Sequence, residues 1–362
     1  MQAIQKLKSE PGLWLQNDVP APKVGPNDVL IAVTHAGICG TDRHIYEWDR
    51  WSQSRIKVGI TTGHEFVGVV SQIGSAVDKF EIGQRVSAEG HIYCGQCKPC
   101  LTGNAHICRQ VEIIGIDRDG CFAQFVSIPQ GNVWPVHPDI PDETAAIFDP
   151  LGNAVHTVME ADVSGKSVLI TGVGIIGLMA VTVARAAGAG KIFVTDVDEN
   201  RLEIAKSLGA DFAYNGKDES WVSQTREQTN GLGPQVLLEM SGNPFAIKQG
   251  FQALADGGTA ALLGIPGDEI SFNLADDIIF KGATVLGING RRIFETWYQM
   301  ESLILSGKLN LEPIITHVID LGSFENGFRM MQSGEAIKVV LKIPQEESLQ
   351  CQIAGSTSGV TS

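Results

Sequence analysis

The sequence has no long hydrophobic run. No apolar stretch reaches the roughly 18–20 residues that a membrane-spanning helix needs, because Gly, Thr or charged residues interrupt the apolar segments. The first fifteen residues also lack the apolar stretch and cleavage site of a secretory signal, and the Arg- and Ser-rich composition of a transit peptide. We therefore expect a cytoplasmic protein with no membrane partner.

Basic residues are scarce. The chain has 27 Lys and Arg against 41 Asp and Glu, which gives a net charge of −14. Because nucleic-acid binding needs a basic surface, we expect no nucleic-acid partner. The chain has 7 cysteines, and an odd number in a cytoplasmic protein argues against a disulfide framework.

The sequence changes character near residue 150. Before it, short β-type runs alternate with turns at residues 28–39, 65–74 and 83–90, and after it buried strands alternate with apolar helices. A chain of 362 residues is long for one domain. We therefore expect an α/β protein with a mostly β domain at residues 1–151 and 294–343, a doubly wound domain at residues 152–293, and a disordered tail at residues 344–362.

Three glycines, Gly172, Gly174 and Gly177, have the G-x-G-x-x-G spacing of a phosphate-binding turn. A β-type run at residues 168–171 precedes them and an apolar helix follows, which is the context of the Rossmann motif. The first glycine permits the tight turn, the second lets the backbone approach a pyrophosphate, and the third lets the helix pack closely on the strand. The alternative is a structural turn that binds no ligand.

Asp196 ends the next predicted strand, about 20 residues further on, where a carboxylate meets the adenosine ribose. A carboxylate there favours NAD, because it repels the 2′-phosphate of NADP. Arg201 follows closely and is expected to pair with Asp196 or to flank the adenine. The alternative for Asp196 is an ordinary turn residue that caps the following helix.

Four cysteines stand close together with C-x2-C-x2-C-x7-C spacing: Cys94, Cys97, Cys100 and Cys108. Four thiolates in one compact lobe suit a closed tetrahedral zinc site. The alternative is an iron–sulfur cluster, but the fourth cysteine is too distant for a ferredoxin pattern, and Arg109 rather than Pro follows it. A zinc-ribbon module that binds nucleic acid would need a basic face, which this acidic chain does not offer.

A second set of metal-ligand residues is dispersed. Cys39, His64 and an acidic residue lie in glycine-flanked β segments, a combination that suits an open catalytic zinc site. A single His or Cys is more often a packed structural residue, so the residues alone leave both interpretations open.

Together these segments resemble the zinc-containing medium-chain alcohol dehydrogenases. The motifs stand in that family's order over residues 1–343: "GICGTDRH", "GHEFVGVV", "GQRV", the four-cysteine lobe and "GVGIIG". The resemblance implies a GroES-like catalytic domain followed by a Rossmann NAD-binding domain. It also implies two zinc ions per subunit, one catalytic and one structural, a small-molecule alcohol as substrate, and a homotetramer.

The resemblance also implies roles for residues of the first domain. Cys39 and His64 bind the catalytic zinc, with Glu65 or Asp149 as third protein ligand. The Thr41 hydroxyl holds the substrate hydroxyl, and His44 passes its proton to solvent. Asp149, if it is not a ligand, assists this proton transfer.

In the second domain the resemblance implies cofactor contacts. The expected residues are Gly172, Gly174, Ile176, Gly177, Asp196 and Arg201, with Leu263, Gly264, Ile265, Ile288 and Asn289 on the nicotinamide side. Asn289 and Arg292 depart from the aromatic and acidic residues associated with their positions, which leaves subunit contacts and details of the nicotinamide loop open.

Three further features remain open. His91 is a candidate polar contact for the substrate, or a loop histidine with a structural role. Trp48, Trp51 and Trp297 are expected to be packing residues. A non-catalytic protein on the same scaffold is the competing functional class, and loss of the zinc or relay residues would favour it, but all of them are present.

Overall fold

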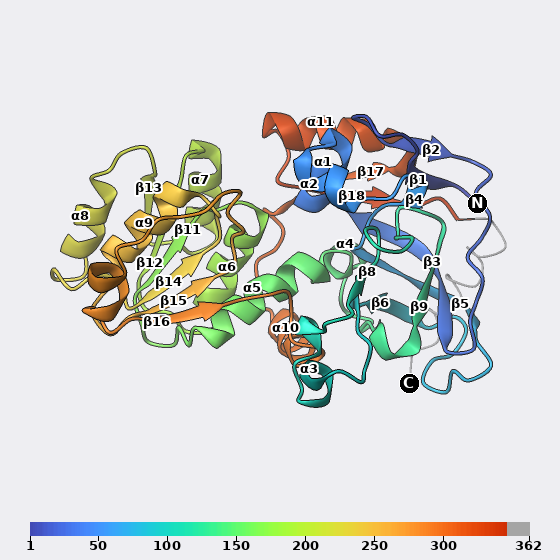
Figure 1. Cartoon of the computed structure of the whole chain (residues 1–362), viewed down its shortest axis with the longest axis horizontal. Coiled ribbons are helices and arrows are strands. Elements are labelled where there is room, and N and C mark those ends of the chain that lie inside the picture. The colour runs from blue at the N-terminus through green and yellow to red at the C-terminus, as the bar shows by residue number, and fades with distance from the viewer. Residues whose placement is uncertain (346–362) are drawn as a thin grey trace. The chain divides into compact units, whose positions relative to one another are not determined.

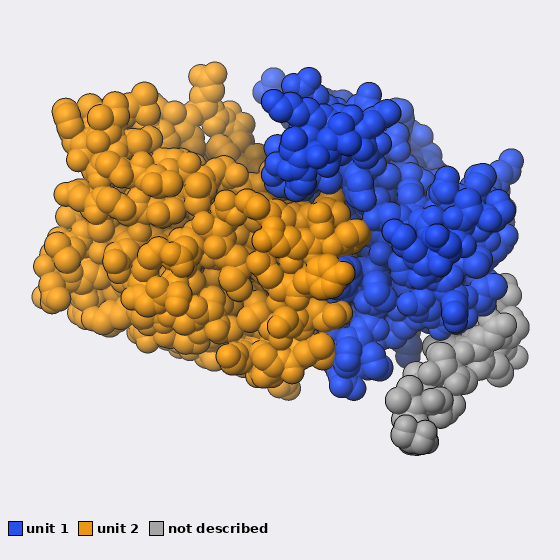
Figure 2. Space-filling model, turned by 90° about the horizontal axis from the view of Figure 1, so that it is seen from below, with its two compact units in different colours: residues 1–149, 315–362 blue, residues 150–314 orange. Residues whose placement is uncertain are grey.

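The computed structural model describes residues 1–345 of the chain, and the predicted tail at residues 344–362 falls almost wholly outside them. The chain divides into two compact units, which Figures 1 and 2 show. Unit 1 contains residues 1–149 and the chain from Ile315 onward, and unit 2 contains Pro150–Ile314. The expected architecture, a mostly β domain and a doubly wound α/β domain, is confirmed.

Unit 1 is built on mostly antiparallel strands, and only β17 and β18 pair in parallel among the described strands. Its larger sheet has the order β10-β6-β5-β3-β18-β17, with β9 also paired to β3, and a smaller sheet has the order β2-β1-β4. The strands of the larger sheet are β3 (Asp28–Gly37), β5 (Phe66–Ile73), β6 (Arg85–Ala88), β9 (Phe125–Pro129), β10 (Val133–Pro135), β17 (Ile315–Asp320) and β18 (Lys338–Lys342). The remaining strands are β1 (Ala3–Lys6), β2 (Trp14–Gln16), β4 (Ile60–Thr61) and the pair β7 (His91–Ile92) and β8 (Glu112–Ile113).

The core of unit 1 lies between these sheets and includes Ile4, Val33, Phe122 and Phe328, all fully buried. The helices of the unit are short. They are α1 (Gly40–Glu47), α2 (Arg50–Arg55), α3 (Lys98–Leu101), α4 (Asp142–Ala145) and α11 (Phe324–Ser333), with 3-10 turns η1 (Ala105–Ile107), η2 (Gln130–Asn132) and η4 (Leu321–Ser323). The candidate site residues Thr41 and His44 and the four-cysteine lobe therefore lie in short segments that connect the strands.

Unit 2 is a six-stranded parallel sheet in the order β13-β12-β11-β14-β15-β16. The strands are β11 (Val168–Thr171), β12 (Ile192–Asp196), β13 (Phe212–Asn215), β14 (Val236–Glu239), β15 (Thr259–Leu262) and β16 (Thr284–Gly287). The strand order reverses between β11 and β14. In doubly wound sheets, ligands bind at this switch point, beyond the carboxyl ends of the strands.

Helices cover both faces of this sheet (Figure 1). They are α5 (Phe148–Glu160), α6 (Ile175–Ala186), α7 (Glu199–Ser207), α8 (Trp221–Glu227), α9 (Pro244–Ala253) and α10 (Glu295–Leu305), with one π-helical turn, η3 (Ala275–Ile279). The central strands β11 and β14 are buried along their whole length, as expected for a parallel sheet covered on both sides.

The structure places one segment differently from the sequence prediction. Residues 294–314, which include α10, belong to unit 2 and not to the mostly β unit. A contact of this segment with unit 2 agrees with that placement: the Asn310 N–H donates to the Thr182 hydroxyl in α6 at 3.1 Å. No helix in residues 1–345 combines the length and the apolar character that crossing a membrane requires.

Candidate active site

The first candidate metal group lies at the ends of two paired strands. Possible ligand atoms of Cys39, His64 and Glu65 all lie within 4.8 Å of one another. Cys39 follows β3, and the other two residues immediately precede β5. These strands pair antiparallel, and the Gly37 N–H donates to the Glu65 carbonyl at 2.9 Å, so the sheet register brings the three residues together.

Glu65 is buried and uses only one carboxylate oxygen. Its Oε2 accepts from Lys338 Nζ, which also donates to the Ile38 carbonyl at 2.8 Å. The other oxygen, Oε1, has no hydrogen-bond partner among the described residues. Burial raises the pKa of the Glu65 carboxyl, and the Lys338 ammonium opposes this shift. A buried oxygen left without a donor fits a metal ligand.

Asp42 stands behind His64. Its Oδ2 accepts the Cys39 N–H at 2.9 Å, and its Oδ1 lies 3.8 Å from His64 Nδ1. Burial lowers the pKa of His64, but the charges of Cys39 and Asp42 outweigh it and raise the pKa well above its usual value. At 3.8 Å, Asp42 Oδ1 and His64 Nδ1 are too far apart for a hydrogen bond, so Asp42 acts on His64 through its charge.

Asp149 belongs to a neighbouring group. It is 9% exposed, and its charge acts on His64, Glu65 and Asp42. Its carboxylate clusters within 4.8 Å of Glu89 and His91, whereas the carboxylate that clusters with Cys39 and His64 is that of Glu65. The geometry therefore favours Glu65 as the third ligand and places Asp149 beside the metal group.

Thr41 and His44 are carried on α1, directly after Cys39. The Thr41 hydroxyl lies 3.9 Å from Cys39 Sγ, so it borders the candidate metal group. His44 Nδ1 lies 2.7 Å from Asp49 Oδ2. The sequence analysis predicted no helix here, so the structure adds both α1 and Asp49, the partner of the histidine.

The four-cysteine lobe forms a second compact group. The sulfur atoms of Cys97 and Cys100 are 3.4 Å apart, those of Cys97 and Cys108 3.8 Å, and those of Cys94 and Cys100 4.0 Å. Thiolates about 2.3 Å from a tetrahedral zinc stand about 3.8 Å from one another, so the residues fit a closed zinc site. Backbone N–H groups of Cys100 and Arg109 lower the pKa of Cys97 to about 6.

The glycine turn of unit 2 has the expected packing. Gly172 has a positive φ of 82°, and a Cβ there would lie 2.6 Å from Ser241 Cβ. A Cβ at Gly177 would lie 2.0 Å from the Gly172 carbonyl oxygen, whereas Gly174 has no atom within 4 Å of such a Cβ. Gly172 and Gly177 therefore have no room for a side chain, whereas Gly174 does. Ile176 follows in the first turn of α6.

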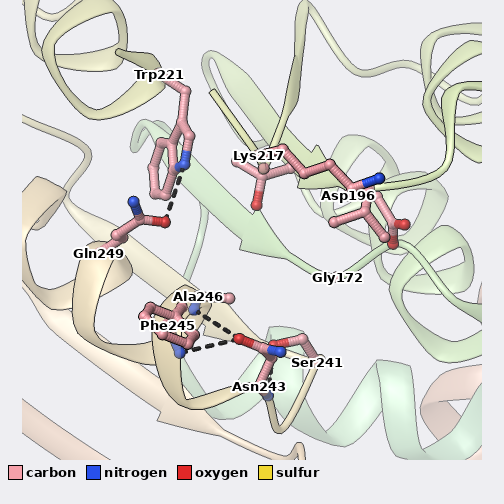
Figure 3. A pocket seen from close by; sticks show the side chains of 12 residues that line it. Gly172, Asp196, Lys217, Trp221, Ser241, Asn243, Phe245, Ala246 and Gln249 are labelled. Atoms are coloured by element: carbon pink, nitrogen blue, oxygen red, sulfur yellow. Dashed lines mark hydrogen bonds between the residues drawn. The ribbon is translucent and has the colours of Figure 1, made fainter. Parts of the chain in front are cut away.

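Asp196 ends β12 and lines a cavity of about 310 Å³ (Figure 3). One of its oxygens accepts the Val173 N–H at 2.8 Å, and the other accepts the Asp198 N–H at 3.0 Å. Arg201 pairs with Asp198 at 3.8 Å and not with Asp196, and it does not line this cavity.

The sequence analysis missed several residues of this cavity. Trp221 and Gln249 form one wall, with Nε1 to Oε1 at 3.3 Å, and Lys217 and Phe245 also line it. Figure 3 shows them around the space that Asp196 faces. Each lies in a helix or loop after a strand of the sheet, and the only signal available in the sequence is this position.

Glu239 connects the loops after β11, β14 and β15. Its buried carboxylate accepts from the Thr171 hydroxyl and from the N–H groups of Ser241 and Gly242, at 2.9–3.3 Å. Its carbonyl accepts the N–H groups of Leu263 and Gly264, both at 3.0 Å. The structure thus brings the predicted glycine turn and the loop after β15 together at one buried anion.

The remaining predicted residues of unit 2 differ in their exposure to solvent. Ile265 is 91% exposed, and Asn289 is also exposed, whereas Ile288 is buried and its N–H donates to the Leu262 carbonyl at 2.9 Å. Arg292 pairs with Glu160 at 2.7 Å and Glu295 at 3.6 Å, so the basic residue at this position has acidic partners.

His91 and the tryptophans also have defined surroundings. His91 Nδ1 lies 2.8 Å from Oε1 of Glu89, a buried carboxylate that the sequence analysis missed. Trp297 is a buried packing residue, as predicted, whereas Trp51 is 41% exposed. The Trp51 ring contacts the His44 ring edge-on, with centroids 6.3 Å apart.

Comparisons with known proteins agree with this arrangement. Family models match as "alcohol dehydrogenase GroES-like domain" at residues 25–139 and "zinc-binding dehydrogenase" at residues 176–306. The chain is 49% identical to the L-threonine 3-dehydrogenase of Chromobacterium violaceum and 48% identical to that of Shewanella frigidimarina, each over 94% of this chain and 99% of the relative.

Solved structures show the same fold. The alcohol dehydrogenase TADH from Thermus sp. ATN1 has a TM-score of 0.87 and 30% identity, covering 95% of this chain and 100% of that one. Galactitol-1-phosphate dehydrogenase from Escherichia coli has a TM-score of 0.86 and 27% identity, covering 94% and 100%. The predicted family, with its zinc and nicotinamide cofactors, is confirmed: the chain belongs to the zinc-dependent medium-chain alcohol dehydrogenases.

Proposed function

We propose that this protein oxidises L-threonine at its 3-hydroxyl to L-2-amino-3-oxobutanoate, with NAD⁺ as hydride acceptor, in threonine catabolism to glycine. The observation that carries the chemistry is the group of Cys39, His64 and Glu65 next to Thr41 and His44. The substrate is supported by the identity of 46–49% to L-threonine 3-dehydrogenases over nearly the whole chain. The alternative is a polyol or other secondary alcohol on the same scaffold.

Cys39, His64 and Glu65 are the residues that would hold the catalytic zinc. Bound there, zinc lowers the pKa of a substrate hydroxyl, as it lowers that of water from about 15.7 to about 7. Asp42 adds negative charge 3.8 Å from the His64 ring, and Lys338 fixes one oxygen of Glu65, which leaves Oε1 for the metal. The four cysteines of the lobe would hold a second, structural zinc.

The chain's own residues move the proton. The Thr41 hydroxyl takes the proton of the substrate hydroxyl and passes its own, by way of the cofactor ribose, to the His44 ring, which releases it to solvent. Such a relay needs no strong base when the substrate hydroxyl is already acidified. Asp149, beside the metal group, contributes negative charge next to the reacting hydroxyl and assists this transfer.

Unit 2 supplies the cofactor site. The glycine turn holds the pyrophosphate at the N-terminus of α6, and Asp196 accepts the ribose hydroxyls, which favours NAD over NADP. Bound there, NAD⁺ would supply the hydride acceptor for the substrate carbon. The residues at Leu263–Ile265 and Ile288–Asn289 line the nicotinamide side, and Glu239 holds the first of these loops in place.

Threonine carries an ammonium and a carboxylate, and a polyol carries neither. We assign His91 as a polar contact for these groups. The buried carboxylate of Glu89 fixes the His91 ring at 2.8 Å and adds negative charge that attracts an ammonium. This is the observation that favours an amino acid over a polyol.

We also propose a cytoplasmic homotetramer. Six cysteines of the described residues are free thiols, which agrees with a reducing compartment. Strand β16 pairs with β15 on one side only among the described strands, and Val285 on it is 40% exposed, so its edge is available to a second copy of the chain. Light scattering after gel filtration measures the assembly.

The test of the proposed function is NADH formation by purified, zinc-replete protein with L-threonine, sorbitol and butane-2,3-diol in parallel. Turnover of threonine well above the other two supports the proposal. Turnover of sorbitol or the diol alone would retain the reaction class and overturn the substrate. The Cys39→Ser variant is the control for activity from a contaminating enzyme.

A further inference from the structure

His44 and Asp49 are joined at the junction between α1 and α2. His44 Nδ1 lies 2.7 Å from Asp49 Oδ2, while Asp49 Oδ1 accepts the Ser52 N–H at 2.9 Å and caps α2. The Asp49 N–H also reaches the His44 carbonyl at 3.4 Å. Each carboxylate oxygen therefore has its own partner, and the carboxylate cannot rotate without losing one of them.

The backbone at this junction directs Asp49 toward His44. Trp48, which ends α1, has φ 57° and ψ 46°, a left-handed conformation that few residues other than glycine adopt. This reverses the chain, so that Asp49 folds back over the last turn of α1. Because this conformation is strained, surrounding contacts must hold it in place.

Lys6 provides such contacts. It is fully buried in β1, its Nζ lies 4.4 Å from the centroid of the Trp48 ring, and it donates to the Ile45 carbonyl in the last turn of α1 at 3.0 Å. Its other two ammonium hydrogens bond the carbonyls of Glu10 and Gly12. All three donors are used, and Lys6 ties the junction to the core of unit 1.

A histidine that accepts a proton needs one ring nitrogen without hydrogen, and the hydrogen bond of the other nitrogen decides which one that is. We infer that Asp49 is a positioning residue for the proton relay: it holds Nδ1 of His44 in the N–H form, so that Nε2 accepts the proton. The aspartate of a Ser-His-Asp triad fixes the tautomer of its histidine in the same way. This inference rests on the proposed function, in which Thr41 passes the proton to His44.

The first test separates this role from capping of α2. Asp49→Asn keeps an N-cap side chain and an acceptor but removes the charge. We expect kcat to fall about tenfold, within the range of general acid–base effects, with KM for threonine and for NAD⁺ within about twofold of wild type and little change in Tm. Asp49→Ala, which loses the cap as well, is expected to lower both kcat and Tm.

Asp139→Asn is the matched control. It alters another histidine–aspartate pair of unit 1, at 3.8 Å on the surface, and should leave kcat unchanged. A double-mutant cycle with His44→Ala then shows whether Asp49 acts through His44. We expect Asp49→Asn to have no further effect in the His44→Ala background. An equal effect in both backgrounds, or a wild-type kcat for Asp49→Asn, would overturn the inference.

A spectroscopic test needs no turnover. Long-range ¹H–¹⁵N correlation spectra of the holoenzyme, with His44 assigned by comparison with His44→Ala, report which ring nitrogen carries hydrogen. The Nδ1–H form supports the inference, and the Nε2–H form contradicts it. If threonine is not oxidised but another alcohol is, the proposed substrate fails. The kinetic tests of Asp49 are then made with that alcohol, and the spectroscopic test is made as before.

Discussion

The two metal-binding groups of unit 1 are assembled in opposite ways. The four cysteines of the lobe come from residues 94–108, and the short turns α3 and η1 bring their sulfur atoms within 4.8 Å. Cys39, His64 and Glu65 instead come from two separate segments, and Lys338 joins them from a third, almost 300 residues away. A local site follows from its spacing, whereas a dispersed site depends on the register of β3, β5 and β18.

Of the two groups, the dispersed one should show the largest loss of activity when a ligand is removed. Cys39→Ser should reduce kcat/KM for threonine at least about a thousandfold, or about 4 kcal/mol, because the hydroxyl of the substrate is no longer acidified. Metal analysis should show a loss of one zinc per chain, with the lobe still loaded. Full activity, or loss of both zinc ions, would contradict separate sites.

The buried pair of Lys338 and Glu65 tests the long-range part of the dispersed site. Lys338→Met leaves the Glu65 carboxylate buried without its counterion, which typically costs about 3–5 kcal/mol of unfolding free energy. We expect a clearly lower urea midpoint for the transition of unit 1, and a smaller loss for Lys338→Arg, which keeps the charge. A Lys338→Met variant as stable as wild type would show that the pair does not stabilise the fold.

The lobe should respond locally. Cys97→Ser should remove the structural zinc and increase hydrogen exchange in residues 94–108, while turnover falls by less than about tenfold. The measurement is exchange mass spectrometry together with zinc content. Increased exchange spread over the strands of unit 1 would mean that the lobe supports the whole fold.

The smallest effect concerns thiol reactivity in the zinc-free lobe. Backbone N–H groups lower the pKa of Cys97 to about 6, whereas burial and neighbouring cysteines raise that of Cys100 to about 12. Because the thiolate is the reactive form and exists above the pKa, alkylation of Cys97 in zinc-stripped protein should fall as the pH drops through about 6. Cys100 should remain unreactive at neutral pH. Equal reactivity of both would show that the lobe loses its geometry without zinc.

The sequence predicted most of the architecture because its signals are periodic and local. The alternation of strands and helices identified the doubly wound unit, and the glycine spacing identified its phosphate-binding turn. The sequence analysis assigned residues 294–314 to the mostly β domain, whereas the structure groups them with unit 2. The local sequence of α10 does not record this grouping, which depends on contacts such as that of the Asn310 N–H with Thr182.

By itself, the sequence determined the types of chemistry present: a thiolate cluster with metal spacing and a phosphate-binding turn. Only the tertiary structure decided which side chains support them. Lys338 meets Glu65, and the buried Glu239 joins the loops after β14 and β15. The reason is physical, because a buried charge must find a partner across the fold, and sequence spacing does not record which strand supplies it.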